Sequence, residues 1–305
     1  TGSEATGQAS GAAGLIASFG RERIAAGGIA GPSSLQPNEI KQLMTLTAED
    51  VVAANTDPAL GATGAVAALP PDPAQPGWDQ HFGYGRPDLG LALERIDEGK
   101  IPPQALITSP DWFSPLNVEQ SDEVEIEARL SAPRAGVVAG SRFQWELRWA
   151  PGIEPALADF DSPSRLIASG SGASEIEATL GALDLEAVRA ALDDRTIVCP
   201  NPTGGAVVLS GGSTCDPTAP GKGPGDVDPN EPAFTVKLEV TDTDGNVAED
   251  RKVLFAYRDS PPHGGSPRPV GREAGAEPGI ADSGGEASQR MYDLNGDNSL
   301  ELIEA

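Results

Sequence analysis

The sequence predicts an α+β chain of several domains: a helical first third, an antiparallel β-sandwich with a helical insertion, a linker and a short acidic tail. Three observations predict this class. Apolar residues recur at helical spacing before about residue 101, they alternate strictly beyond it, and Pro and Gly dominate a later stretch. We therefore expect domains at residues 1–101, 102–258, 259–285 and 286–305.

Three helices are expected in the first third. Residues 1–31 are rich in Gly and Ala, and such a sequence forms a good helix only where backbones pack closely in a core. Apolar residues at helical spacing after Pro37, which suits a first helical turn, predict a second helix within residues 33–55. A Gly-rich turn leads into the third, within residues 82–100, which Gly99 closes.

The alternating stretches predict strands of a sandwich. Residues 123–133 and 142–152 each place apolar side chains on one face, and residues 101–113 read as an extended connector. Residues 234–259 predict a hairpin whose turn is Asp242–Asn246; Asp-Gly between strands indicates a turn rather than a metal site. Between the strands, EIEATLGALDLEAVRAAL predicts an amphipathic helix or a pair of short ones.

Composition and charge narrow the function classes. The chain has 305 residues, 38% of them hydrophobic, which is enough for a sizeable core. Its 46 acidic and 21 basic residues give a net charge of −25. That charge opposes non-specific binding to nucleic acid and docking on anionic lipid, and it attracts divalent cations. Because no run of about 18 apolar residues occurs, we expect no membrane span.

Ser3 stands at the head of the small-residue helix, in TGSEATGQASGAAGLI. A nucleophilic serine benefits from this position, because the helix N-terminus and its backbone N–H groups favour negative charge developing on a substrate oxygen. A serine before a helix is, however, more often an N-cap than a nucleophile. The position alone leaves both roles open.

Three segments, in order, carry a resemblance to a family: GSEATGQASGAAGLI, LQPNEIKQLMTLTAEDV and FGYGRPDLGLAL. They resemble successive segments in the last third of the catalytic domain of subtilisin-like serine proteases (subtilases). The resemblance implies that residues 1–101 are the helical C-terminal portion of a subtilisin-like α/β domain. It implies that Ser3 is the catalytic nucleophile of a Ser-His-Asp triad whose His and Asp lie upstream. Gly2, Gly7 and Gln8 depart from the family's Thr, Pro and His.

Two functions remain open. The chain begins at Thr1, and we expect it to be a fragment of a secreted serine endopeptidase that acts on protein or peptide substrates and is completed by the upstream part of the same domain. The alternative is a non-catalytic extracellular binding or adhesion protein with a degenerate subtilase-like remnant. The hairpin at 234–259 resembles Ig-like or PKD-like modules, which says little about a ligand. His81 and His263 are expected to be solvated or hydrogen-bonded rather than catalytic.

The acidic tail places oxygen-bearing residues at regular spacing. Counted from Asp293, the loop positions 1, 3, 5, 7, 9 and 12 carry Asp293, Asn295, Asp297, Ser299, Glu301 and Glu304. The loop resembles an EF-hand, with Asn298 where Gly is usual, and it predicts weak Ca²⁺ binding; the alternative is an acidic disordered tail. Cys199 and Cys215 form either a disulfide or two free thiols.

Overall fold

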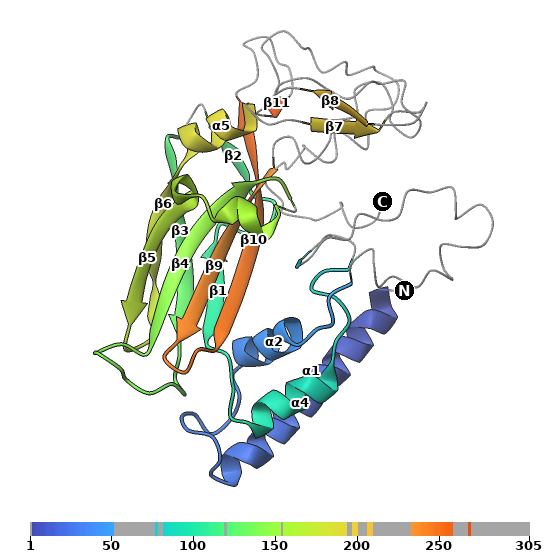
Figure 1. The fold of residues 1–305 in the computed structure, drawn as a ribbon, viewed down its shortest axis with the longest axis vertical. Coiled ribbons are helices and arrows are strands. Elements are labelled where there is room, and N and C mark those ends of the chain that lie inside the picture. Colours follow the sequence, from blue (N-terminus) through green and yellow to red (C-terminus); the bar gives the residue numbers. More distant parts are fainter. Residues whose placement is uncertain are drawn as a thin grey trace, which may run out of the picture.

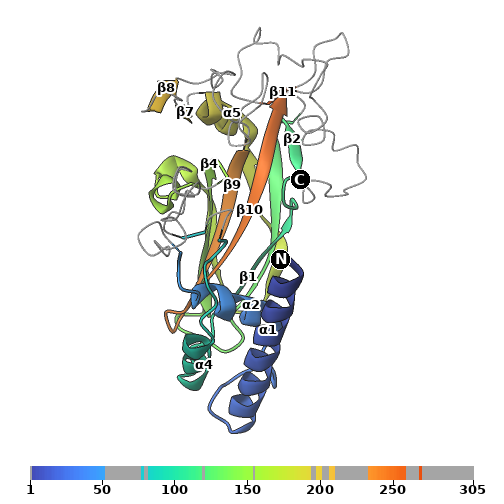
Figure 2. The ribbon, with the colours of Figure 1, turned by 90° about the vertical axis from the view of Figure 1, so that its right-hand side faces the viewer.

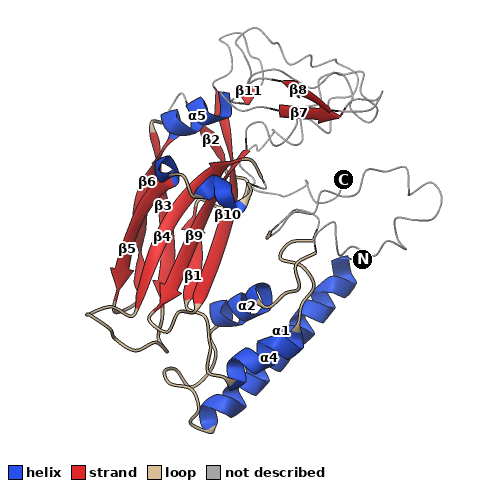
Figure 3. Ribbon diagram, viewed as in Figure 1, coloured by secondary structure: helices blue, strands red, loops and turns tan. Residues whose placement is uncertain are grey.

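The structure is a computed structural model, and it has an α+β fold (Figure 1). The helices gather mainly at one end of the strands (Figure 3). The residues that the structure describes are 2–51, 77–78, 82–118, 121–153, 155–193, 197–200, 206–209, 233–258 and 268–269.

The helices of the first third lie where the sequence predicts them. Pro37 occupies the first turn of α2, whose start is held by a hydrogen bond from the Gln36 backbone N–H to Glu39 Oε2 (2.8 Å). Asp88 caps α4 by accepting from the Leu91 N–H (2.9 Å), and Gly99 ends it with φ 71°, as predicted. The helices are α1 (Gly2–Ala25), α2 (Pro37–Leu46), α4 (Leu89–Asp97) and α5 (Leu185–Asp193), with 3-10 turns η2 (Leu157–Phe160) and η3 (Pro163–Arg165).

The strands form two larger sheets and one small hairpin. A three-stranded sheet has the order β1-β3-β6, and the second sheet runs β11-β10-β9-β4-β5 with β2 pairing parallel to β10. The strands are β1 (Gln104–Ser109), β2 (Pro115–Asn117), β3 (Glu123–Ser131), β4 (Phe143–Pro151), β5 (Leu166–Gly172), β6 (Ile176–Asp184), β7 (Ile197–Pro200), β8 (Ala206–Leu209), β9 (Ala233–Asp242), β10 (Val247–Arg258) and β11 (Arg268–Pro269).

One hydrophobic core joins the two larger sheets. Ile126, Ala128 and Leu130 of β3 are fully buried, and they meet the alternate residues of β9 and β4 from the other sheet. The predicted hairpin is confirmed: β9 and β10 are antiparallel, with Thr241 opposite Val247 across the turn. Trp149 of β4 lies in this core, and the Trp145 ring packs at its edge.

Two sequence predictions were wrong in part. Residues 176–184, predicted as helix, form strand β6, which pairs along β3 from Glu123↔Asp184 to Leu130↔Ile176. The helix α5 begins only at Leu185, because the β3 edge offers the preceding residues a full ladder of hydrogen bonds. The predicted connector 101–113 contains strand β1, so the segment at the expected domain boundary is part of a sheet.

The arrangement places helices at both ends of the strands. Helices α1, α2 and α4 gather at one end, and α5 lies at the opposite end (Figures 1 and 2). Of the first three, α2 lies nearest to the strands, and it contacts β1 and β10 (Figure 1). The surface between α2 and the two sheets is therefore where the first third of the chain is joined to the strands.

Candidate functional site

Ser3 lies in the first turn of α1, a helix of 24 residues. Its backbone position agrees with the predicted place at the head of the helix, but its side chain is outside what the structure describes. Farther along, α1 has an unusual surface. Residues 5–19 carry no charged side chain, yet most of them are exposed, including Leu15 at 47%. A surface helix normally presents charged residues to water, so this surface of α1, built of small and uncharged residues, is unusual.

The three segments that resemble the protease family pack against one another. Ile16 of α1, Leu43 of α2 and Ala92 of α4 are at most 1% exposed and belong to one cluster, distinct from the core between the sheets. Helices α1 and α4 also contact each other. The order in sequence is thus matched by proximity in space, with all three segments contributing to one small core.

Gly85 in the FGYGRPD segment is required by a close backbone approach. The Glu49 and Arg86 backbones exchange two hydrogen bonds (2.7 and 2.9 Å), which draws the Gly85 Cα against the Glu49 carbonyl. Gly85 has φ 107°, and a Cβ there would overlap that carbonyl oxygen. Only glycine combines this conformation with this approach. The contact ties the segment after α2 to the segment before α4.

A buried ion pair joins α2 to the strands. Glu39 of α2 is fully buried, and Arg134, in the loop after β3, binds it with two hydrogen bonds of 2.8 and 3.0 Å. The same guanidinium donates to the carbonyl oxygens of Ala30 (2.9 Å), Pro32 (3.3 Å) and Ser34 (2.8 Å). All three nitrogens of the Arg134 guanidinium therefore donate hydrogen bonds. These bonds hold α2 and the loop that leads into it in place.

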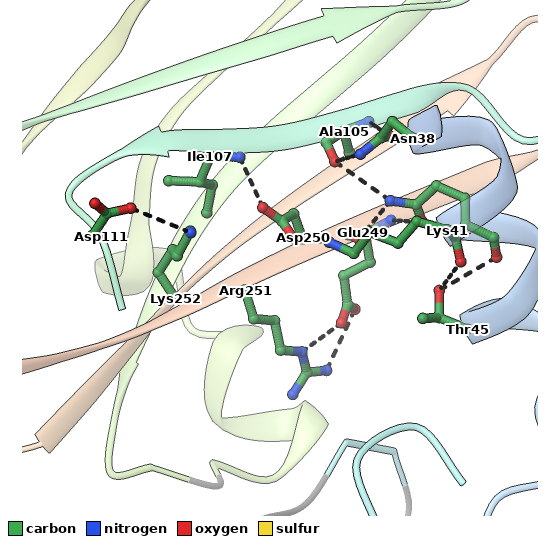
Figure 4. Close-up of polar contacts among 11 residues, drawn as sticks. Asn38, Lys41, Thr45, Ala105, Ile107, Asp111, Glu249, Asp250, Arg251 and Lys252 are labelled. Carbon is green, nitrogen blue, oxygen red and sulfur yellow. Dashed lines mark hydrogen bonds and ion pairs between the residues drawn. The ribbon is translucent and has the colours of Figure 1, made fainter. Parts of the chain in front are cut away.

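Two amide side chains of α2 complete the open edges of both sheets (Figure 4). Asn38 accepts from the Ala105 N–H (2.9 Å) and donates to the Ala105 carbonyl (3.0 Å), as a neighbouring strand would. Gln42 does the same for Glu249 of β10, with bonds of 3.0 and 2.9 Å. Two residues one helical turn apart thus cap β1, an edge strand of one sheet, and the part of β10 in the other sheet that neither β2 nor β11 pairs with.

Asp250 fills the remaining gap between those two edges. Its carboxylate accepts from the Ile107 N–H of β1 (2.8 Å) and pairs with the Lys41 ammonium group of α2. The side chain is almost fully buried, so Lys41 supplies the positive charge that a buried carboxylate requires. We name the set Asn38, Glu39, Lys41, Gln42, Arg134 and Asp250 the α2 junction.

Charged side chains also form two rows, one acidic and one basic, that run across β4, β9 and β10 on the outer face of their sheet. Phe160 of η2 lies over the basic row, 5.2 Å from Lys237 Nζ and 5.5 Å from the Arg251 guanidinium. Each basic residue pairs with the acid two positions away on its own strand. The rows are Glu146, Glu239 and Glu249, and beside them Arg148, Lys237 and Arg251. Because Phe160 covers it, the basic row is a packed structural surface rather than an open site.

Tyr84 lies beside this surface. Its burial, and then the negative charge of Glu249, raise the pKa of the Tyr84 phenol above its ordinary value. Both effects disfavour the phenolate, so the neutral hydroxyl is the form that the fold stabilises.

The other sequence-predicted sites lie outside the described residues. These are the calcium loop with Asp293, Asn295, Asp297, Ser299, Glu301 and Glu304, as well as His81, His263 and Cys215. Cys199 lies in β7, where only the backbone is described. Within the described ranges, no group of three or more His, Cys, Asp or Glu side chains is placed to hold a metal ion. The Asp242 carboxylate accepts from the Asp244 and Asn246 N–H groups (2.9 and 2.8 Å), as expected of a turn.

Sequence reasoning did not find the α2 junction. Asn38, Glu39 and Gln42 read as ordinary polar residues of a helix surface, and their partners lie 67 to 207 residues away in the chain. The available signal was weak. The polar positions of α2 fall on one side at spacings of three and four, which is the pattern of a face that meets another element.

Comparisons with known proteins add no family. No protein-family model matches the chain, and no curated protein matches its sequence. Among the helices in the described part of the chain, none is long and apolar enough to cross a lipid bilayer.

Proposed function

We propose that this chain is the C-terminal part of a secreted subtilisin-like serine endopeptidase, with Ser3 as its nucleophile. In this proposal Ser3 attacks the carbonyl carbon of the scissile peptide bond. The N-terminal N–H groups of α1 stabilise the resulting oxyanion. The general base and its aspartate come from the upstream part of the same domain, because a serine hydroxyl without a base is a weak nucleophile.

One observation carries the proposal: the uncharged surface of α1. Small, uncharged residues exposed over several helical turns are typical of a helix covered by another part of the protein. The first half of α1, which begins with Ser3, has this character, whereas its last turn carries Arg23 in an ion pair with Asp97. The proposal assigns the uncharged half to contact with the upstream part of the domain, and this places Ser3 at the covered end.

An active-site probe tests the proposal on the full-length protein that contains this chain. A fluorophosphonate is expected to label Ser3, on the tryptic peptide that ends at Arg21. Ser3→Ala should abolish labelling, while Ser18→Ala, in the same helix and the same peptide, should leave it intact. Labelling that survives Ser3→Ala, or no labelling of the unmodified protein, would refute the nucleophile. The second outcome favours the non-catalytic adhesion protein, to which the departures at Gly7 and Gln8 already point.

For the tail we propose a weak Ca²⁺ site in the loop from Asp293 to Glu304. Support comes from the spacing of its oxygen-bearing residues, which matches the positions that surround Ca²⁺ in EF-hand loops. Calorimetric titration of the full chain with Ca²⁺ should release heat that Glu304→Gln abolishes. Glu286→Gln, an acidic residue just before the loop, should leave the titration unchanged. Equal loss in both variants would reduce the effect to the general attraction of an acidic chain.

A further inference from the structure

A hollow of about 560 Å³ opens beside the α2 junction. Distant segments line it: Gln36 before α2, Gln104 of β1, Arg129 of β3, Arg142 before β4 and Glu175 in the β5–β6 turn. Its size lies in the usual range for small-ligand pockets, which prefer places where separate structural units meet. The junction fixes the segments of Gln36 and Gln104 relative to each other, because Asn38 of α2 binds both backbone groups of Ala105 in β1.

Two guanidinium groups line this hollow. In the part of the chain that the structure describes, Arg129 has no hydrogen-bond or ion-pair partner. Arg142, just before β4 of the other sheet, donates to the Ala135 carbonyl through one of its N–H groups. Arg134 nearby differs from both, because its N–H groups already donate to Glu39 and to three backbone carbonyls. Arg129 and Arg142 therefore offer N–H donors to an anion, and guanidinium matches the planar geometry of a carboxylate.

A nearly buried polar pair and small apolar residues complete the lining. Gln104 and Ser131 are 7% and 6% exposed, and the Gln104 amide donates to Ser131 Oγ (2.8 Å). The Gln104 carbonyl and the Ser131 hydroxyl hydrogen remain for a ligand, and together they can pair with one peptide group. Pro32 and Pro133 add apolar surface to the same lining.

Charge limits the class of anion. Glu175 lines the hollow, and Glu177 stands opposite Arg129 in the strand register. Two carboxylates beside two guanidinium groups disfavour a dianion such as phosphate, while a single negative charge can still be held between the guanidinium groups. The lining therefore combines donors for one carboxylate, partners for an adjacent peptide group and room for a small apolar side chain.

We propose that this hollow binds the free C-terminal carboxylate of a peptide. Arg129 and Arg142 hold the carboxylate, the Gln104–Ser131 pair holds the preceding peptide group, and Pro32 and Pro133 contact the side chain. The proposal involves no covalent step, and it stands whether or not Ser3 is a nucleophile.

The test uses two probes that differ only in the charged group: N-acetyl-leucyl-alanine with a free carboxylate, and the same dipeptide as its C-terminal amide. Titration of the full chain, followed by calorimetry or by NMR shifts of the peptide, should show at least tenfold tighter binding of the acid. Arg129→Gln and Arg142→Gln should each weaken binding of the free-acid probe by about tenfold and leave binding of the amide probe unchanged. Arg189→Gln, on α5 at the far end of the strands, is the matched control and should have no effect.

Three results would overturn the proposal. The acid and the amide could bind equally, inorganic phosphate could displace the acid at equal concentration, or Arg129→Gln could bind the acid as well as the control does. Arg129 is partly exposed and has no partner in the described residues, so its replacement should not disturb folding, which a thermal melt checks. Arg142→Gln provides the second, independent variant.

Discussion

Replacing Arg134 by Met should be among the most destabilising single changes in this protein. The change removes two charge-assisted hydrogen bonds to Glu39, which has 0% exposure, and the donors to three carbonyl oxygens. Removing one partner of a buried ion pair leaves the other charge in a medium of low dielectric constant, and this typically costs about 3–5 kcal/mol. We expect a loss of that size in the free energy of unfolding.

A double-mutant cycle isolates the ion pair. Glu39→Gln keeps an acceptor for the Gln36 N–H but removes the buried charge. The double variant should therefore lose less stability than the two single variants added together, with a coupling energy of about 0.5–3 kcal/mol. Urea unfolding of the full chain, followed by tryptophan fluorescence, measures each corner of the cycle.

The matched control is an arginine in an exposed pair. Arg23 binds Asp97 with side chains 40% and 55% exposed, so Arg23→Met should cost less than about 1 kcal/mol. If Arg134→Met costs no more than Arg23→Met, or if the cycle is additive, the Arg134–Glu39 contact does not hold the α2 junction together.

Three further changes probe other contacts. Asn38→Ala should cost about 1–3 kcal/mol and speed hydrogen exchange at the Ala105 amide, because the Ala105 N–H loses its partner and its carbonyl keeps only the 3.4 Å bond from Gln42; an unchanged exchange rate would contradict the edge-capping role. Gly85→Ala should cost about 1–3 kcal/mol, measured by urea unfolding, while Gly83→Ala, with open space around its Cβ, should cost less; equal losses would refute the close approach. Ultraviolet titration should find the Tyr84 phenol still protonated at the pH at which exposed tyrosines lose their proton. Because its pKa is higher in the folded state, its contribution to stability is complete below pH about 10 and is lost above it; a Tyr84→Phe variant with the same alkaline stability profile would contradict this.

The helices show how far local patterns reach. Pro37, Asp88 and Gly99 mark helix ends through their own chemistry, and the structure confirms them because caps and turns depend on neighbouring residues. The end of α2 was harder to predict. The helix stops at Leu46, before the apolar Val51 that extends its pattern. There the Thr47 hydroxyl donates to the Leu43 carbonyl (2.7 Å), and the Glu49 backbone turns away to pair with Arg86.

The strands show the opposite limit. Alternation identified β3, β4, β9 and β10, whose core-facing residues are mostly apolar, with Asp250 of β10 as an exception. The alternation pattern failed to identify β6, because small residues such as Ala178 and Gly181 stand where a typical strand has large apolar ones. The sequence of β6 therefore fits helical spacing equally well. The α2 junction could not be predicted at all, since no local pattern identifies which distant backbone groups Asn38 and Gln42 will meet.

The capping of β1 and β10 by α2 has a consequence for solubility. An unpaired strand edge is a template on which another chain can add a strand. The described edge groups at Ala105 and Glu249 are satisfied by side chains from residues 38 and 42, so the first fifty residues keep those edges from neighbouring molecules. A chain that starts at residue 101 would present both edges to solvent, and it should self-associate by strand pairing even if its hydrophobic core were intact.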